Sequence, residues 1–297
     1  MFTLHHLTGN TYYIDTPTNI GLYQLNEQDC ILIDTCFMGK STERLIQTLE
    51  HHQLCVKAVL TTHAHLDHCG SNACIKEKYE AIVAAPPLES TFIEYPELSS
   101  ILIFPSAPFS DMGEYLPKGI SVDTLLDKEE FFIQDATFNI FPLKGHSLNQ
   151  VGIVTPDQCI FIGDTFLSKE TLDKEKMIYN YDIPLAIDSM KSLLDTSYNF
   201  YVPSHGIPLK QIEDTIHHNL NRIYETARQL KTLLSQKPLS LDQIMGILIS
   251  EYGITAQTRQ YYIAQACVTS FLSFLENKGE IKRFFQNGIL TFKTVEL

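Results

Sequence analysis

Short apolar segments alternate with amphipathic ones along the first two thirds of the chain. Runs rich in β-branched and aromatic residues, bounded by turn formers, predict strands at 11–14, 20–25, 30–33, 56–61, 81–84, 138–143, 151–155 and 159–162. Apolar positions three and four residues apart predict helices at 41–50 and 71–79. Strands and helices that alternate in this way predict an α/β fold built in layers.

The pattern becomes helical after about residue 208. Apolar residues at near-helical spacing predict one long helix over 211–237. Ser240 and Gln243 have the spacing of a capping box, which predicts that a second helix starts there. A third helix is predicted over 256–278, and many of its residues are apolar.

A hairpin is predicted at the end of the chain. Residues 281–293 form two strand-like runs on either side of Asn287-Gly288, a pair typical of tight hairpin turns. Helices followed by a hairpin predict a winged-helix-like module. We therefore expect two domains, one over 1–208 and a helical, winged-helix-like one over 209–297.

The charge of the chain is distributed unevenly between these two parts. The 297 residues are 44% hydrophobic and 19% charged, with a formal net charge of −13. Residues 1–205 contain 12 Lys and Arg against 27 Asp and Glu, whereas residues 206–297 contain 10 against 8. A net negative charge disfavours nucleic acid and anionic membranes as partners. The step in charge near residue 205 agrees with two domains.

The cysteine pattern and the lack of long apolar runs predict a cytoplasmic protein. The seven cysteines are scattered and odd in number, and they form no C-x-x-C pair, which favours free thiols in a reducing compartment. No run of eighteen apolar residues occurs, so no membrane-spanning segment is expected. The first residues also lack the basic and apolar features of a secretory signal.

Residues 86–118 differ in composition from their surroundings. Six of the thirteen prolines lie there, interspersed with phenylalanines and tyrosines. A long aromatic loop is typical of a lid, a binding loop or an interface. The alternative is an insertion that packs on its own domain.

The strongest chemical signal is the segment His63-Ala-His65-Leu-Asp67-His68, which directly follows an apolar strand. Imidazole and carboxylate groups are the ligands that zinc and similar divalent metals prefer. In a tight loop, the first two histidines can point to one side and the last two residues to another, which would serve two adjacent ions. The alternative, a solvated loop rich in histidine, does not explain the aspartate within the spacing.

Three further candidate ligands stand alone along the chain. His146, Asp164 and His205 each follow an apolar run, and each has a glycine beside it that allows close approach of the backbone. With the first segment they make seven ligands, a number that suits two ions.

This ordered set of residues resembles the metallo-β-lactamase-fold hydrolases, over residues 1 to about 208. Ile31-Leu-Ile-Asp34 matches the strand that precedes the metal loop in that family. The resemblance implies an αββα sandwich with two divalent ions, most simply zinc, with iron or manganese as alternatives. It implies the following roles: His63, His65 and His146 at the first ion, Asp67, His68 and His205 at the second, Asp164 as the bridge, and Asp34 orienting a ligand histidine.

Two departures from the family pattern are informative. Cys69 follows the first motif where relatives often have glycine, and it is either a packed thiol or a reactive one. The common β-lactamase branch lacks the aspartate ligand and has cysteine at the position of Asp164. This chain has Asp67 and Asp164, so it looks unlike an antibiotic-destroying enzyme. The C-terminal module resembles the tail of a branch that includes glyoxalase II-like hydrolases and lactamase-like endoribonucleases.

The function that these features predict is a dinuclear metal-dependent hydrolase. A metal-bridging hydroxide would attack a small ester or thioester, with Asp67 and Asp164 as catalytic residues. The 86–118 segment, Tyr179 and Tyr181 are expected to line the cleft and bind the small-molecule substrate. The alternatives are a metal-dependent endoribonuclease or phosphodiesterase, a mono-iron enzyme that oxidises sulfur compounds, and a non-catalytic binding protein.

The apolar helix over 256–278 predicts that the C-terminal module is buried against another surface. It has Arg259 and Lys278 as its cations, too few for a nucleic-acid recognition helix. We expect the module to cover one side of the active site or to support a homodimer. Binding to nucleic acid is the less favoured alternative.

Overall fold

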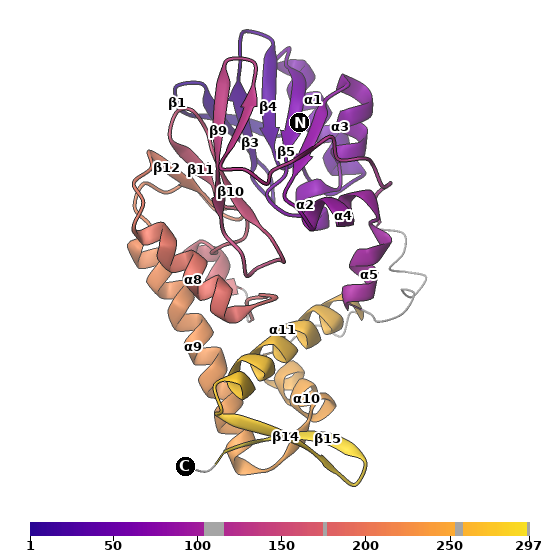
Figure 1. Ribbon diagram of the computed structural model, residues 1–297, viewed down its shortest axis with the longest axis vertical. Coiled ribbons are helices and arrows are strands. Elements are labelled where there is room, and N and C mark those ends of the chain that lie inside the picture. The colour runs from indigo at the N-terminus through magenta and orange to yellow at the C-terminus, as the bar shows by residue number, and fades with distance from the viewer. Residues whose placement is uncertain (104–115, 175–176, 253–257, 296–297) are drawn as a thin grey trace.

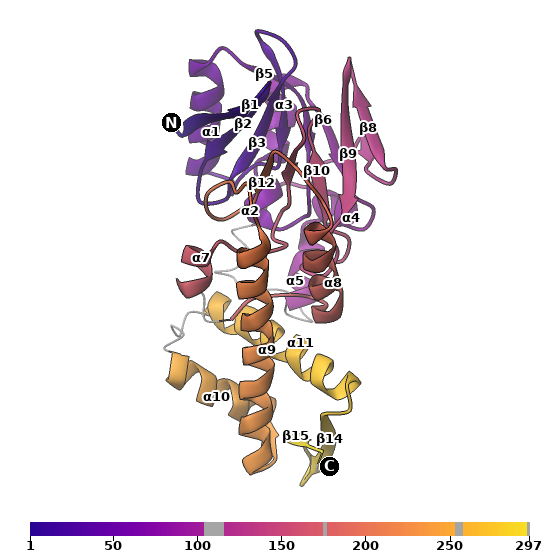
Figure 2. The ribbon, with the colours of Figure 1, turned by 90° about the vertical axis from the view of Figure 1, so that its left-hand side faces the viewer.

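The computed structural model describes residues 1–103, 116–174, 177–252 and 258–295. Two sheets lie face to face, helices cover their outer faces, and a C-terminal module extends from one edge (Figures 1 and 2). This arrangement confirms the predicted αββα sandwich with a C-terminal helical module.

The first sheet has seven strands, and its central strands are largely buried on both faces. In spatial order the strands are β1 (Thr3–Thr8), β2 (Thr11–Asp15), β3 (Ile20–Gln24), β4 (Asp29–Ile33), β5 (Cys55–Leu60), β6 (Ile82–Ala85) and β7 (Thr124–Leu125). After Asp29, strand β4 is apolar to its end, because Ile31 and Ile33 face the second sheet while Cys30 and Leu32 face the outer helices.

Two helices cover the outer face of the first sheet. They are α1 (Lys40–His51) and α3 (Asn72–Tyr79), close to the ranges expected from their spacing. Leu45 and Leu49 of α1 and Ile75 of α3 are fully buried against the strands. Burial of an apolar stripe of this kind holds a short helix on a sheet.

The second sheet contains five strands and forms the other half of the sandwich. Its order is β12 (Phe200–Val202), β11 (Cys159–Phe161), β10 (Val151–Val154), β9 (Ala136–Pro142) and β8 (Glu130–Ile133). Its outer face is covered by α8 (Ile183–Leu194) and by the first part of α9 (Glu213–Gln236). Helix α8 was not predicted, although its start carries a capping signal, since the Asp182 side chain accepts a hydrogen bond from the Leu185 N–H.

The C-terminal module follows α9 and confirms several local predictions. Its elements are β13 (Leu239–Ser240), α10 (Leu241–Tyr252), α11 (Thr258–Asn277), β14 (Ile281–Gln286) and β15 (Ile289–Thr294). The Ser240 N–H donates to the Gln243 side chain, which closes one half of the capping box, and the Gln243 N–H donates back to the Ser240 hydroxyl. Asn287 and Gly288 both have positive φ, as a tight hairpin turn requires.

One hydrophobic cluster runs without a break from the sandwich into the C-terminal module. Ile160 of the second sheet, Ile223 and Leu234 of α9, and Phe271 of α11 all belong to it. Many apolar residues of α11 are therefore buried within the same chain. Their burial does not require a second copy of the protein. The division into 1–208 and 209–297 stays a prediction, and this shared core does not break at that boundary.

The 86–118 segment is more helical than its composition suggested. It contains α4 (Glu89–Glu94) and α5 (Glu97–Ile103), while residues 104–115 lie outside the described part of the chain. The expectation of a plain loop is wrong for these two helices, each of which starts with a glutamate, a residue that favours a helix N-terminus. Helix α5 contacts α11, so the segment meets the C-terminal module.

Among the described residues, no helix is both long and apolar enough to cross a membrane.

The shared core predicts that the sandwich and the module unfold together. Replacing the fully buried Ile223 with alanine should lower the free energy of unfolding by about 2–5 kcal/mol, because it leaves a cavity between α9 and its neighbours. The matched control is Tyr224→Ala on the exposed side of the same helix, which should cost much less. Thermal unfolding followed by circular dichroism should show one transition in each variant, and two separate transitions would contradict a shared core.

Candidate metal centre

The carboxyl ends of several strands meet at the edge of the sandwich that lies next to the C-terminal module (Figures 1 and 2). Strands β4 and β5 are parallel, and they are followed by Asp34 and by His63 and His65. Strands β11 and β12 are also parallel, and they lead to Asp164 and His205. Since parallel strands end at the same edge, residues far apart in the sequence are brought together there.

The remaining two ligands of the first motif lie on a short helix. Asp67 and His68 belong to α2 (Leu66–Cys69), a single helical turn directly after His65. The helical turn brings them into the second group of potential ligands, and the His68 ring still lies 4.0 Å from the ring of His63. The sequence predicted two diverging pairs in a tight loop, and the structure places the two pairs in adjacent groups that remain in contact.

Glycines with positive φ allow two of the lone ligands to reach the centre. Gly145 precedes His146 and has a φ of 125°, and Gly206 follows His205 with a φ of 114°. A Cβ atom on Gly145 would overlap the backbone of Ala186 in α8, and one on Gly206 would overlap Ser168. Any other residue would therefore push the adjacent histidine out of place.

Three histidines and one aspartate form a first group of potential ligands. His65 Nδ1 lies 3.1 Å from His63 Nε2 and 2.9 Å from His146 Nε2. One Asp164 oxygen lies 3.3 Å from His146 Nε2. Nitrogen ligands of a tetrahedral zinc ion, each about 2.0–2.1 Å from the metal, are about 3.3 Å apart. The spacing of these atoms therefore suits a shared divalent ion.

Asp67, His68 and His205 form a second group. Asp67 Oδ2 lies 3.7 Å from His68 Nε2 and 3.8 Å from His205 Nε2. The second oxygen of Asp164, Oδ1, lies 3.5 Å from His68 Nε2 and 3.8 Å from His205 Nε2. Asp164 thus contacts both groups, and the structure brings all seven predicted ligands into one cluster.

Asp34 orients two of the imidazoles. Its Oδ2 atom accepts a hydrogen bond from His68 Nδ1 at 2.8 Å and another from the Thr62 hydroxyl at 2.7 Å. Because the Thr62 proton goes to Asp34, the Thr62 oxygen is free to accept the Nδ1 proton of His63 at 3.1 Å. Such second-layer acceptors fix the tautomer and direction of a ligand histidine.

Backbone carbonyls orient two other histidines in the same way. The His146 Nδ1 proton is donated to the Tyr179 carbonyl at 3.2 Å, and that of His205 to the Pro17 carbonyl at 2.7 Å. Four imidazoles therefore have Nδ1 committed to an oxygen and direct Nε2 at the cluster. His65 differs, since its Nδ1 faces the other ligands.

Two buried polar atoms at the centre lack a hydrogen-bond partner among the described residues. They are His68 Nε2 and Asp164 Oδ1, which face each other at 3.5 Å. Buried polar atoms without partners are costly, and a cation between them satisfies both. The donor atoms of the cluster, imidazole nitrogen and carboxylate oxygen, are those that zinc, iron and manganese accept.

Burial keeps the first group of histidines neutral. It is the main cause of the lowered pKa of His63, His65 and His146, and the pKa of His65 falls to about 4. Neutral imidazoles are the form that binds metals. For His68, burial acts in the same direction, but the carboxylates of Asp67 and Asp164 outweigh it and hold its pKa well above the usual value.

The predicted substrate residues lie in different surroundings. The Tyr179 ring packs against the rings of His65 and His146, with centroid separations of 5.9 and 5.6 Å. The Tyr181 side chain is half-exposed at 52%. The Cys267 thiol of α11 donates to the carbonyl of Ile178, so the C-terminal module supports the segment that carries Tyr179.

Cys69 has the surroundings of a packed thiol. Its side chain is buried, and its Sγ–H donates to the Ala64 carbonyl at 3.4 Å. Burial raises the pKa of this thiol well above its ordinary value, which keeps it protonated and unreactive. All seven cysteines are free thiols, as their spacing predicted.

Three polar residues around the cluster were missed by sequence reasoning. Thr62 and Glu89 are buried and hydrogen-bonded beside the ligand loops, and the Thr18 hydroxyl donates to Asp67 at 3.0 Å. None of them stands in a spacing that indicates a metal site. Thr62 offered the only signal, its place next to the first ligand.

Comparison with known proteins identifies the family. Residues 13–205 match the description "Metallo-beta-lactamase superfamily". The chain belongs to that superfamily. The predicted family, and the predicted enzyme class of metallo-hydrolase, are thereby confirmed.

Individual relatives resemble the chain over different lengths. A beta-lactamase-like protein 2 homolog of Drosophila melanogaster is 22% identical over 92% of this chain and 84% of its own length. Hydroxyacylglutathione hydrolase 1 of Vibrio vulnificus is 25% identical over 63% of this chain and 62% of its own. A beta-lactamase domain protein of Burkholderia ambifaria shares the fold with a TM-score of 0.76 at 17% identity, over 98% of this chain and 93% of its own. Because the match covers nearly the whole of this chain, the shared fold includes the C-terminal module.

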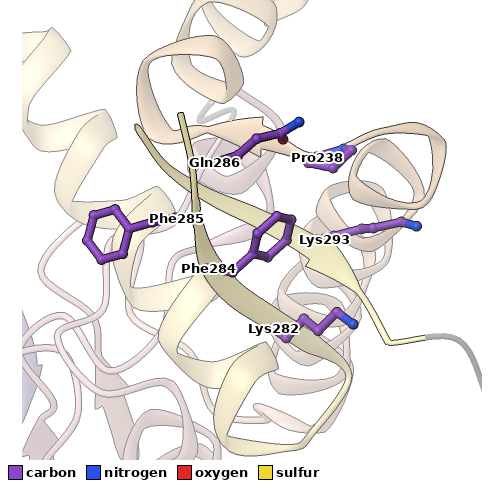
Figure 3. Close-up of a pocket in the computed structure, with 6 residues that line it drawn as sticks. All are labelled: Pro238, Lys282, Phe284, Phe285, Gln286 and Lys293. Carbon is purple, nitrogen blue, oxygen red and sulfur yellow. The ribbon is translucent and has the colours of Figure 1, made fainter. Parts of the chain in front are cut away.

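A separate depression lies on the sheet of the C-terminal module, at the far end of the molecule from α2 (Figures 1 and 3). Its lining residues are Pro238, Lys282, Phe284, Phe285, Gln286 and Lys293. Lys282 and Lys293 are paired directly across β14 and β15, and Phe284 lies on the same side of the strand as Lys282. The lining is therefore basic and aromatic, and it belongs to a different surface from the seven ligands.

Proposed function

We propose that the chain is a dinuclear metal-dependent hydrolase that acts on a small ester or thioester. The observation that carries the proposal is the common orientation of four histidines. His63, His68, His146 and His205 each have Nδ1 hydrogen-bonded outward and Nε2 directed at one centre. A histidine buried in an ordinary core does not need three others directed at the same centre, whereas a metal site requires converging nitrogen ligands.

The two groups of side chains suit two ions with three or four protein ligands each. His63, His65 and His146 would hold the first ion and Asp67, His68 and His205 the second, with Asp164 between them. Nitrogen and carboxylate ligands in this proportion favour zinc, and iron and manganese are the alternatives.

Each carboxylate at the centre has a position that suits catalysis. Two bound divalent ions would lower the pKa of a water molecule and polarise the oxygen of the substrate. Asp67 and Asp164 can hold the attacking water in line by accepting its hydrogen bond. The charge of the His68 imidazole outweighs burial and keeps the pKa of Asp164 well below its usual value, so Asp164 acts as an acceptor at neutral pH.

Tyr179 and the helices of the 86–118 segment support a small acyl substrate. Burial raises the pKa of Tyr179 to about 12, so its phenol stays protonated and can donate to a substrate oxygen. The similarity to a hydroxyacylglutathione hydrolase supports a thioester, an acyl group carried on sulfur. The net negative charge of residues 1–205 disfavours a polyanion near the same site.

RNA cleavage is the second candidate, because the depression in Figure 3 offers a place for a strand outside the metal centre. Lysines can contact phosphates, and exposed phenylalanines can stack on bases. Glu276, which pairs with Arg283 at 3.3 Å, reduces the positive charge near the hairpin. We therefore favour the small-molecule substrate.

The proposal places the enzyme in the cytoplasm, in keeping with its seven free thiols. In this proposal the C-terminal module supports the walls of the active site, since α11 contacts both α5 and the backbone next to Tyr179. A homodimer stays a prediction.

The metal assignment predicts a selective loss of ions. Wild-type protein should carry two divalent ions per chain, and His146→Ala should lose the first because three converging nitrogens become two. Elemental analysis of purified protein measures both. The matched control is His52→Ala, an exposed histidine outside the cluster, which should keep both ions. Unchanged metal content in His146→Ala would overturn the assignment, and one iron per chain with oxygen consumption on a persulfide would support the sulfur-oxidising alternative.

Tyr179 is predicted to affect substrate binding without affecting the metal. Tyr179→Phe removes one hydrogen bond, which should raise the KM for a thioester about 2- to 10-fold while metal content stays the same. Steady-state kinetics and elemental analysis test this together, with Tyr224→Phe on the exposed face of α9 as the control. A KM equal to wild type would show that the Tyr179 hydroxyl does not contact the substrate.

The choice between a small substrate and RNA can be tested by binding. Labelled RNA titrated at low and moderate salt should bind weakly to the wild-type protein, with little change when Lys282 and Arg283 are both replaced by alanine. Phosphate contacts would instead make affinity fall steeply with salt. Tight, salt-dependent binding that the double variant loses would favour the ribonuclease.

A further inference from the structure

A buried carboxylate, Glu89, lies between the two loops that carry the first group of ligands. Its side chain is at the start of α4 and is only 2% exposed. Oε2 accepts a hydrogen bond from the Ala64 N–H at 2.9 Å. Oε1 accepts two more, from the Ser147 hydroxyl at 2.7 Å and from the Asn149 N–H at 2.8 Å.

The donors to Glu89 are direct neighbours of the proposed metal ligands. Ala64 stands between His63 and His65, and Ser147 follows His146. One carboxylate therefore joins two chain segments more than eighty residues apart, and these segments supply all three nitrogens of the first group. A shift of either loop relative to the other would separate the nitrogens that now lie 2.9–3.1 Å apart.

The contacts of Glu89 require a side chain whose two terminal atoms both accept hydrogen bonds. All three partners are donors, and two of them are backbone amides that cannot change role. A glutamine in the same place would turn its amino group towards one of these donors, so at least one contact would be lost. The ion pairs recorded for the described residues do not include Glu89, so its charge is offset by hydrogen bonds alone.

The backbone before Glu89 also holds it in this direction. Leu88 has a φ of 72°, a conformation that a non-glycine residue adopts only when its surroundings enforce it. The side chain of Asn149 donates to the carbonyl of Pro87, which fixes the same turn to the His146 loop at a second point. Pro87 before Leu88 and Glu89 after it are therefore both hydrogen-bonded to the loop of His146.

The second group of ligands is held by other residues. His68 is oriented by Asp34, Asp67 by Thr18, and His205 by the carbonyl of Pro17. The hydrogen bonds recorded for Glu89 do not reach any of these three ligands. Asp34 also reaches His63 of the first group through Thr62, so the two proposed sites share that residue. Glu89 differs from Asp34, since its hydrogen bonds hold the loops of the first group alone.

We propose that Glu89 is a positioning residue for one metal ion only. By fixing the loop of His63 and His65 against the loop of His146, it raises the affinity of the first site and leaves the second unaffected. This inference rests on the proposed dinuclear function, and it adds that the two sites can be weakened separately.

Single-site variants allow the two affinities to be measured apart. His205→Ala removes a ligand of the second site, and His146→Ala removes one of the first. Glu89→Gln is then introduced into each variant, and Co²⁺ affinity is determined from the visible absorption of the bound ion. In the His205→Ala background, Glu89→Gln should weaken Co²⁺ binding about 10- to 100-fold, the usual effect of losing an outer-layer partner. In the His146→Ala background, the affinity should change less than about 3-fold.

A half-buried carboxylate that also accepts hydrogen bonds from two donors provides the control. The Asp157 carboxylate accepts hydrogen bonds from the Asn10 N–H at 2.7 Å and the Thr11 hydroxyl at 2.8 Å, and it lies at the opposite end of β11 from Asp164. Asp157→Asn should lower the Tm without changing the Co²⁺ affinity of either single-site variant. It separates the effect of a lost carboxylate contact on stability from an effect on the metal.

The outcomes distinguish this inference from the proposed function. Absence of Co²⁺ binding in otherwise wild-type protein would reject the metal proposal itself. Two bound ions with equal weakening of both sites by Glu89→Gln would reject the positioning role, because a general loss of structure affects both. If Glu89→Gln does not fold, Ser147→Ala removes one donor only, and it should weaken the first site by a smaller factor. Unchanged affinity in that variant would overturn the inference.

Discussion

The direction of four imidazole rings is the constraint on which the site depends. Each ring gives its Nδ1 proton to a different oxygen, which directs its Nε2 at the centre. Asp34 and Thr62 supply two of these oxygens just after β4 and β5, at the edge where the ligand segments after β9, β11 and β12 also converge. The other two oxygens are the carbonyls of Pro17, after β2, and Tyr179, before α8. The fold thus holds the seven polar side chains close to their binding positions before any ion binds.

The C-terminal module is connected to the candidate metal centre through a shared hydrophobic core. The cluster that covers the second sheet continues through α9 to α11, and the Cys267 thiol of α11 contacts the backbone beside Tyr179. Tyr179 in turn accepts the proton of His146 with its carbonyl. A change in the module therefore has a short path of contacts to one of the proposed ligands, which gives the module a structural reason to be part of the same chain.

The sequence was sufficient to find the seven candidate ligands that the fold brings together and most of the elements, and it was insufficient where contacts are long-range. The seven candidates could be found because the first motif is dense and the others follow apolar runs beside glycines. Helix α8 was missed although its sequence carries the signals of a helix, since Asp182 caps its start and its buried residues recur at helical spacing: Ile183, Ala186, Ile187, Met190 and Leu193. Glu89 could not be found, since its partners lie at 64, 147 and 149 and only the closed fold brings them together.

Anomalous diffraction from crystals of the metal-loaded protein is the most direct test of the central claim. The account predicts two peaks about 3.5–4 Å apart within the seven side chains, with Asp164 contacting both. His63, His68, His146 and His205 should bind through Nε2, and His65 through Nδ1. A single peak, a peak outside this cluster, or coordination through Nδ1 of any of those four histidines would contradict it.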